Sequence, residues 1–331
     1  MRRPPLIAGV LALGLAGCGS AGPKQPAGAT STASAAKPST VAARPAAPPQ
    51  LRATVAGHLP APVQLPAVTA LGSGVVALGG LDAADASSAN VISVHGGTGH
   101  VIGHLPSALH DAAAATVGGH AYFIGGGNAG AGVRSILRVS PGGSVNDTGT
   151  QLPAGASDVS AVTIGRTIYV VGGYTGTVPL RSILAFTPGR PVRVVGEMPR
   201  PLRYAAVAAA GGNVLIAGGT SGVTARREVL RFSPRTGHVT RVARLPAPLT
   251  HAAGAALGGR FYVLGGRGDG LTAQHAAIYA LDGGQMVRAG RLPQALSDLG
   301  AAASGGRIIV VGGRDAGGGV KDTVLALEPA R

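Results

Sequence analysis

The sequence predicts an all-β fold made from six copies of one four-stranded unit. Its 331 residues include 56 glycines and 24 prolines but no tryptophan, which is typical of a chain rich in turns. An interior glycine costs a helix about 1 kcal/mol relative to alanine, so this composition favours strands. A glycine pair and a Leu-Pro pair recur at a common step along the chain, and these repeats indicate the number of units.

The two markers keep the same register over the whole repeat. The glycine pairs follow one another at intervals of 46, 47, 46, 47 and 47 residues. They are Gly79-Gly80, Gly125-Gly126, Gly172-Gly173, Gly218-Gly219, Gly265-Gly266 and Gly312-Gly313. The second marker occurs at Leu59-Pro60, Leu105-Pro106, Leu152-Pro153, Met198-Pro199, Leu245-Pro246 and Leu292-Pro293.

One period contains four strand signals. In the second copy, apolar runs cover residues 112–117, 121–124 and 136–139, and a weaker fourth strand precedes Leu152. The first strand of each copy is rich in Ala and Gly, which suits strands crowded around an axis. Four-stranded units of this length, repeated six times, predict a six-bladed β-propeller.

The two ends of the repeat are complementary. The chain stops after a third strand at 323–327, and residues 54–60 match the fourth strand at 101–106 without a blade of their own. We therefore expect a strand near residues 52–57 to complete the last blade and to close the ring, which removes a free sheet edge.

The repeat resembles the Kelch family over residues 51–331. Kelch repeats end their second strand in a glycine pair, often shortly after a tyrosine, as at Tyr122, Tyr169 and Tyr262. The outer-strand tryptophan usual in Kelch repeats is absent, and aliphatic residues such as Val192 and Val239 stand there. The resemblance implies a six-bladed Kelch-type propeller and leaves its activity open.

The N-terminus predicts export and a lipid anchor. Arg2 and Arg3 precede a short apolar run at 6–15, which is typical of a secretory signal over residues 1–17. Leu15-Ala16-Gly17-Cys18 resembles a bacterial lipobox, which implies lipidation of Cys18 and a membrane-anchored, extracytoplasmic protein of the cell envelope. Residues 18–50, rich in Ala, Pro, Ser and Thr, then form a disordered tether.

Two loop sets on one face of the propeller hold the candidate binding residues. The first set enters each first strand, and the second follows each glycine pair. Together they predict a face made of Gln64, Asp82, His110, Asp111, Asn128, Ser157, Asp158, Tyr174, Arg203, Tyr204, Thr220, Thr250, His251, Arg267, Asp269, Ser297, Asp298, Arg314 and Asp315. The alternative is that these are solvated turn residues, because Asp, Ser and Asn suit β-turns.

Two functions follow from this face. The first is a binding or scaffolding module for a protein, peptide or glycan. The second is a carbohydrate-active enzyme that uses Asp111, Asp158, Asp298 and His251 as acid–base groups, since six-bladed Kelch proteins include sugar mutarotases. Converging carboxyl groups with shifted pKa values in a central pocket would favour the enzyme.

Charge and cysteine content exclude other classes. Cys18 is the only cysteine, so the propeller has neither disulfides nor a cysteine-based metal site. Residues 51–331 contain 23 basic and 13 acidic residues, a net charge of +10 that favours anionic envelope partners. Aromatic residues make up only 3% of the chain and offer no stacking platform for nucleic acid. We expect a monomer with no cofactor, no metal and no nucleic-acid partner.

Overall fold

The computed structural model describes Gly22, residues 47–128 and residues 131–330. The chain divides into units at 1–44 and 45–331, and all the strands belong to the second unit. The predicted signal, Cys18 and most of the tether lie outside the described residues, so the anchor stays a prediction. The described residues form strands and turns, and none of them belongs to a helix that could cross a membrane.

Strands of the second unit form consecutive groups of four. The first blade contains β2 (Ala67–Leu71), β3 (Gly74–Leu78), β4 (Asn90–His95) and β5 (Thr98–His104). The second contains β6 (Ala113–Val117), β7 (His120–Ile124), β10 (Ser135–Val139) and β11 (Val145–Gln151), with the short pair β8 (Gly127–Asn128) and β9 (Ala131–Gly132) in its loop. The third contains β12 (Ser160–Ile164), β13 (Thr167–Val171), β14 (Ser182–Phe186) and β15 (Arg193–Glu197). The fourth contains β16 (Ala206–Ala210), β17 (Asn213–Ala217), β18 (Arg226–Phe232) and β19 (Val239–Leu249). The fifth contains β20 (Ala253–Leu257), β21 (Arg260–Leu264), β22 (Ala277–Asp282) and β23 (Gln285–Arg291). The last contains β24 (Gly300–Ser304), β25 (Arg307–Val311), β26 (Thr323–Pro329) and β1 (Leu51–His58).

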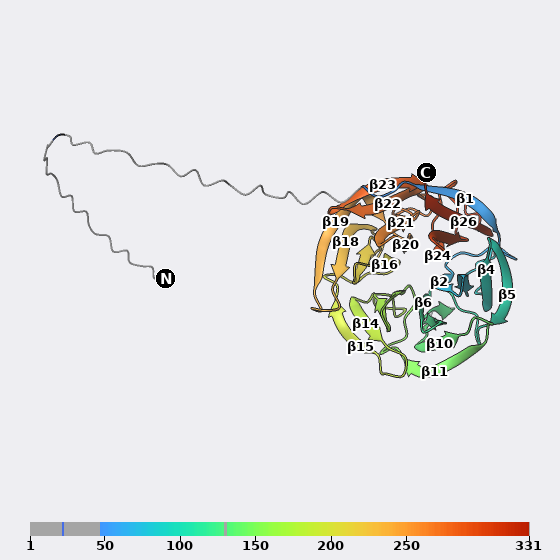
Figure 1. The fold of residues 1–331 in the computed structure, drawn as a ribbon. Helices are drawn as coiled ribbons and strands as arrows, with labels where there is room; N and C mark the ends of the chain where they lie inside the picture. The colour runs from blue at the N-terminus through green and yellow to red at the C-terminus, as the bar shows by residue number, and fades with distance from the viewer. Residues whose placement is uncertain (1–21, 23–46, 129–130, 331) are drawn as a thin grey trace, which may run out of the picture. The chain divides into compact units, whose positions relative to one another are not determined.

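These blades stand around a central axis as a propeller, with the first strands innermost (Figure 1). Blades one to four are separate four-stranded sheets, whereas blades five and six share one eight-stranded sheet. The join is a short parallel contact between β1 and β23, at Leu51–Gly290 and Arg52–Arg291. The four-stranded unit therefore occurs six times, and the predicted propeller fold is confirmed.

The ring closes through β1. This N-terminal strand pairs antiparallel with β26 from Leu51–Pro329 to His58–Thr323, with a bulge after Val55. Leu51 is buried between the last two blades, while Val55 faces solvent. The N-terminal closure predicted from the sequence is thus confirmed, and the outer edge of the last blade is covered.

The core lies between neighbouring blades. Leu78 and Val91 of the first blade, for example, pack against Phe123 and Val139 of the second. Second strands such as β3, β7, β17 and β21 are buried on both faces over their last four residues, which explains why their sequences are apolar runs rather than alternating ones.

The glycine pair joins each blade to the next. The amide of the second glycine donates to a carbonyl in the entry loop of the following blade, at N–O distances of 2.8–2.9 Å in all six blades. The same carbonyl lies only 2.1–2.5 Å from the position that a Cβ on the first glycine would occupy. These first glycines also have φ near +60°. The repeat therefore requires glycine for two reasons, space and backbone conformation.

Replacing one of these glycines tests this contact. Gly172→Ala would place its Cβ 2.1 Å from the carbonyl oxygen of Leu202 at φ +61°. We expect it to lower the free energy of unfolding by about 3 kcal/mol or more, because a backbone clash adds to the strain of the left-handed conformation.

Gly165→Ala is the matched control for that substitution. Gly165 has the same φ, +61°, but nothing lies within 4 Å of its added Cβ. We expect a loss of only about 1 kcal/mol in denaturant unfolding, the cost of a left-handed alanine. Equal losses in the two variants would contradict a blade-to-blade role for the glycine pair.

Candidate functional site

The two predicted loop sets lie together on one face. In every blade, the residue that enters the first strand forms a β-bridge with the residue that follows the glycine pair. These bridges are Gln64–Leu81, His110–Gly127, Ser157–Tyr174, Arg203–Thr220, Thr250–Arg267 and Ser297–Arg314. We call this face, which contains both loop sets, the mouth face.

A ring of six left-handed residues surrounds the axis on the mouth face. Each stands two residues before a first strand and has φ between 54° and 60°. They are Leu65, Asp111, Asp158, Tyr204, His251 and Asp298. This conformation costs a residue other than glycine about 1–2 kcal/mol, and its repetition in every blade shows that the architecture imposes it.

Backbone hydrogen bonds link this ring around the axis. The amide of one ring residue donates to the carbonyl of the ring residue in the preceding blade at five junctions, with N–O distances of 2.7–3.3 Å. The bonds run from Leu65 to Asp298, Asp298 to His251, His251 to Tyr204, Tyr204 to Asp158 and Asp158 to Asp111. The ring side chains consequently converge on one small space.

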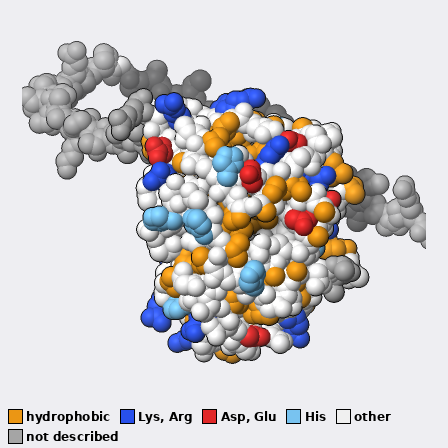
Figure 2. Space-filling view, turned by 90° about the vertical axis from the view of Figure 1, so that its right-hand side faces the viewer, with side chains coloured by type: hydrophobic (Ala, Val, Ile, Leu, Met, Phe, Trp, Pro, Cys, Tyr) orange, Lys and Arg blue, Asp and Glu red, His pale blue; other side chains and the backbone are white. Residues whose placement is uncertain are grey.

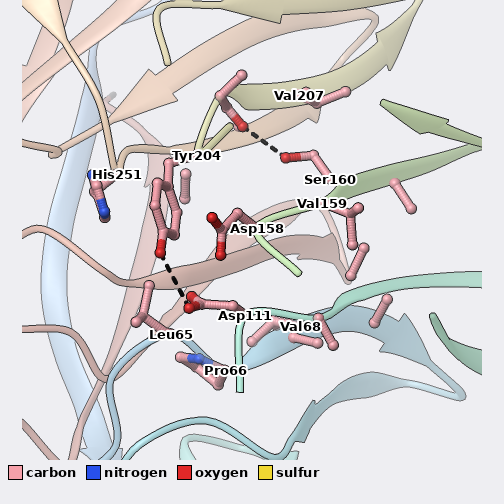
Figure 3. A pocket seen from close by; sticks show the side chains of 18 of the residues that line it. Leu65, Pro66, Val68, Asp111, Asp158, Val159, Ser160, Tyr204, Val207 and His251 are labelled. Carbon is pink, nitrogen blue, oxygen red and sulfur yellow. Dashed lines mark hydrogen bonds between the residues drawn. The ribbon is translucent and has the colours of Figure 1, made fainter. Parts of the chain in front are cut away.

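That space is a cavity of about 150 Å³ at the mouth of the axial channel. All six ring residues line it, and small residues of the first strands form its floor (Figure 3). A second cavity of about 280 Å³, lined mainly by Ala and Thr, continues along the axis below it. Of these two cavities, only the upper one is lined by Asp, His and Tyr side chains.

Asp111 and Asp158 form an unequal carboxyl pair. Asp158 forms an ion pair with Arg203, whereas Asp111 Oδ2 accepts a hydrogen bond from the Tyr204 hydroxyl at 3.1 Å. Burial raises the pKa of Asp111 well above its usual range, and the nearby charge of Asp158 raises this pKa further. Asp111 therefore holds a proton more readily than an ordinary aspartate, while Asp158 is held by Arg203.

Tyr204 and His251 form a stacked pair beside the carboxyl groups. Their ring centroids lie 3.7 Å apart with 24° between the planes. Arg267 Nη2 lies 3.2 Å from His251 Nε2, and Thr250 Oγ1 lies 3.1 Å from Nδ1. Because arginine only donates, Nε2 accepts and Nδ1 carries the proton. Burial lowers the pKa of His251 to about 2, and the charges of Arg267 and Arg203 add to this effect.

Asp298 supplies a third carboxyl group to the cavity. It accepts a hydrogen bond from Ser297 Oγ, and its Oδ1 lies 3.9 Å from His251 Nε2. Burial raises the pKa of Asp298, although the Ser297 hydroxyl and the nearby arginines oppose that shift. The cavity therefore offers carboxyl, hydroxyl and imidazole groups that can donate or accept protons.

Other predicted residues line two grooves beside the cavity. A groove of about 310 Å³ contains His110, Asn128, Ser157, Tyr174 and Arg203, and it shares Asp111, Asp158 and Tyr204 with the cavity. A groove of about 330 Å³ contains Thr220, Thr250, Arg267 and Asp269, and it shares Tyr204 and His251. The cavity thus opens into a wider polar surface over the second to fifth blades.

The remaining predicted residues serve their own loops. Asp82 accepts from the amides of Ala84 and Ala86, and Asp315 accepts from those of Gly317 and Gly319. Arg314 reaches Asp85 at 3.4 Å. These residues lie on the mouth face but outside the cavity, as expected for turn residues.

The sequence prediction missed Leu65. It occupies the ring position where the other blades have Asp, Tyr or His, and it leaves one apolar wall in a polar cavity. Alignment of the six repeats could have identified this position, two residues before each first strand.

The described part of the chain contains no cluster of three or more His, Cys, Asp or Glu side chains placed to hold a metal ion. The groups that line the cavity are carboxyl, hydroxyl and imidazole side chains, with guanidinium groups beside them.

Comparison with known proteins finds one sequence motif and one similar fold. Residues 155–189, which run from the entry of the third blade to its third strand, match the Kelch motif. A solved structure titled "Structure of YjhT" superposes with a TM-score of 0.70, covering 82% of this chain and 97% of that chain. The chain is a β-propeller that carries a Kelch motif in its third blade. No curated protein matches the sequence.

The resemblance to YjhT is one of fold. Sequence identity is only 16%, so the side chains at the mouth of this Kelch propeller must be interpreted from their own geometry. The mouth cavity and its two grooves are the candidate site on this propeller.

The state of His251 leads to a pH-dependent prediction. Its pKa is lowered to about 2 in the folded protein, against about 6.5 in an unfolded chain. The unfolded state therefore binds the proton first, and the stability that His251 contributes is present above pH 6.5 and lost as the pH falls below it. The loss approaches 1.4 kcal/mol per pH unit, about 2 kcal/mol between pH 6 and pH 4.

His251→Gln should reduce that acid loss by about 2 kcal/mol, measured by denaturant unfolding at several pH values, because an amide takes up no proton. The raised pKa of Asp111 makes its contribution to stability change with pH in the opposite direction. The quantity to compare is therefore the difference between wild type and variant in the free energy of unfolding at each pH. His100→Gln, at an exposed site on β5, should leave the wild-type slope unchanged. Equal slopes for wild type and His251→Gln would contradict a neutral, buried His251.

Proposed function

We propose that this Kelch propeller binds a small hydroxyl-rich ligand, a sugar or the end of a glycan, in the mouth cavity. The observation that carries this proposal is the convergence of five polar side chains from five consecutive blades. Asp111, Asp158, Tyr204, His251 and Asp298 all line one cavity, and each is held by the left-handed ring. Buried polar groups without ligands are costly, and such sites are usually functional.

The chemistry of the cavity suits hydroxyl groups. Asp158 and Asp298 offer acceptor oxygens, while the carboxyl proton of Asp111 and the guanidinium of Arg203 offer donors. Asp111 Oδ1 is buried and has no protein partner, so one polar atom in the cavity is left for a ligand. Leu65 gives the apolar wall that the carbon face of a sugar ring requires.

The two side grooves support recognition of more than one residue of a glycan. Both are continuous with the cavity through Tyr204, and both contain hydroxyl and arginine side chains. A lipid on Cys18, as proposed from the sequence, would hold this site outside the cytoplasm near the cell-envelope glycans.

The second candidate is acid–base catalysis on the same sugar. It is favoured by one observation, the raised pKa of Asp111 beside Asp158, which is paired with Arg203. Opening a hemiacetal ring requires an acid that protonates the ring oxygen and a base that takes the anomeric hydroxyl proton, and closing the ring returns both protons. A mutarotase of this kind needs neither cofactor nor redox partner.

Binding is tested by thermal shift and calorimetry of residues 47–331 with neutral, acidic and amino monosaccharides. A ligand at about 100 times its Kd should stabilise the folded protein by about 2.7 kcal/mol. Asp158→Asn should weaken the binding at least tenfold, because a buried charge-assisted hydrogen bond is worth about 1.5–3 kcal/mol. Asp147→Asn, an exposed site on β11, is the control and should bind as the wild type does.

No stabilisation by any sugar, or equal binding by wild type and Asp158→Asn, would contradict the proposal. Anomer exchange of a sugar that binds, followed by NMR, then separates the two candidates. If the mouth is catalytic, Asp111→Asn should slow the exchange by about 100-fold while the sugar still binds. Binding without faster exchange in the wild type would leave the protein as a binding module.

A further inference from the structure

Positive charge is concentrated on the fourth blade. Its segment, residues 203–249, contains seven arginines and one glutamate, whereas residues 59–105 of the first blade contain neither lysine nor arginine. The side of the molecule that carries β4 and β5 accordingly shows histidines in its middle, with lysine and arginine toward the margins (Figure 2). Seven arginines against one glutamate give this segment +6, more than half of the +10 of residues 51–331.

Part of this charge lines a groove on the face opposite the mouth. The groove has a volume of about 500 Å³ and lies between the turn at Gly211-Gly212 and the hairpin that joins β18 to β19. Arg231, Arg235 and His238 line it, together with Asn213, Ser233, Thr236 and Thr240. No carboxylate is among these residues. We call it the blade-four groove.

The two arginines have no counter-charge. Among the described residues, Arg231 and Arg235 form neither an ion pair nor a side-chain hydrogen bond, and both are exposed. Other arginines have acidic partners, as in Arg181–Glu197 at 3.1 Å and Arg307–Glu328 at 3.3 Å, whereas no acidic residue lines the blade-four groove. Two like charges in one groove oppose each other unless an anion joins them.

The other blades provide an internal control for this feature. The position of Arg231, opposite the middle of the second strand, holds Ser93, Arg138, Ala185, Ala280 and Ala326 in the remaining blades. The third blade has an arginine, Arg190, in its outer hairpin but Ala185 at the position of Arg231. The second blade has Arg138 at that position but glycines in its outer hairpin. Because those blades fold without both arginines, the pair is not required by the blade architecture.

The hairpin holds Arg235 in a defined place. Ser233 N donates to His238 O at 3.0 Å, and the amides of Thr236 and Gly237 both donate to Ser233 O, at 3.2 and 2.9 Å. A rigid turn reduces the entropy that ordering an arginine would otherwise cost on binding.

We propose that the blade-four groove binds phosphate groups. Guanidinium groups match phosphate oxygens with two parallel hydrogen bonds, and the Thr and Asn side chains add neutral donors. The phosphate belongs either to a soluble phosphorylated molecule or to an anionic headgroup at a membrane. This site lies on the opposite face from the mouth and is independent of the sugar proposal.

The test compares two double variants of the folded domain, residues 47–331. Arg231→Gln with Arg235→Gln removes the groove charges, while Arg138→Gln with Arg190→Gln removes the same number of charges from other blades. Pyrophosphate is titrated by calorimetry at constant ionic strength, and phosphatidylglycerol vesicles are used in a sedimentation assay. An unchanged melting temperature without ligand shows that each variant is folded.

Wild type and the control double variant should bind at least one probe saturably, and the groove variant should bind it at least tenfold more weakly. A loss confined to pyrophosphate assigns the site to soluble phosphates, and a loss confined to vesicles assigns it to headgroups. Equal weakening in both double variants, or no saturable binding by wild type, would overturn the proposal, since net charge alone or an adventitious ion only would then account for any signal.

Discussion

The hydrogen bond from each glycine pair to the next blade is the constraint on which this propeller depends. Neighbouring blades also meet through apolar side chains, which fix no register because hydrophobic contacts are non-directional, and through the backbone bonds of the left-handed ring, which join five of the junctions. The amide of the second glycine, 2.8–2.9 Å from a carbonyl in the next entry loop, sets that register in all six blades. Alanine in place of the first glycine would meet the same carbonyl at 2.1–2.5 Å, so the blades could not approach as closely.

The same contact positions the candidate site. The carbonyl that receives the bond belongs to the entry loop, and the left-handed ring residue follows two residues later, as Asp111 follows Leu109 and Tyr204 follows Leu202. Left-handed backbone turns each ring side chain toward the axis, where Asp111, Asp158 and Asp298 come together despite their mutual repulsion. The free energy of blade packing thus maintains a costly polar cluster, which is typical of a functional site. The blade-four groove is positioned differently, because it lies at an outer hairpin whose sequence differs from blade to blade.

Much of the fold could be predicted from the sequence because every blade places the same backbone constraints on the same positions of the repeat. Glycine pairs, Leu-Pro pairs and the unmatched strand at 54–60 mark the blades and their closure, and the structure confirms all three. Asp111, Asp158 and His251 were predicted on one face for the same reason. Their contacts were not predictable. Tyr204 and Asp111 are 93 residues apart in the sequence, and they touch only because the closed ring brings their blades to the same axis. Leu65 was missed because its left-handed φ has no signature in an apolar residue. The blade-four groove was missed because its arginines were counted only in the net charge.

Hydrogen exchange at the glycine pairs tests the central claim most directly. The amides of Gly80, Gly126, Gly173, Gly219, Gly266 and Gly313 should exchange only through global unfolding, although all six stand at loop entries. Exposed turn glycines such as Gly119 and Gly212 provide the fast reference in the same experiment. Protection of all six amides to the level of the buried second strands would support the account. Exchange of these amides at the rate of the turn glycines would contradict it.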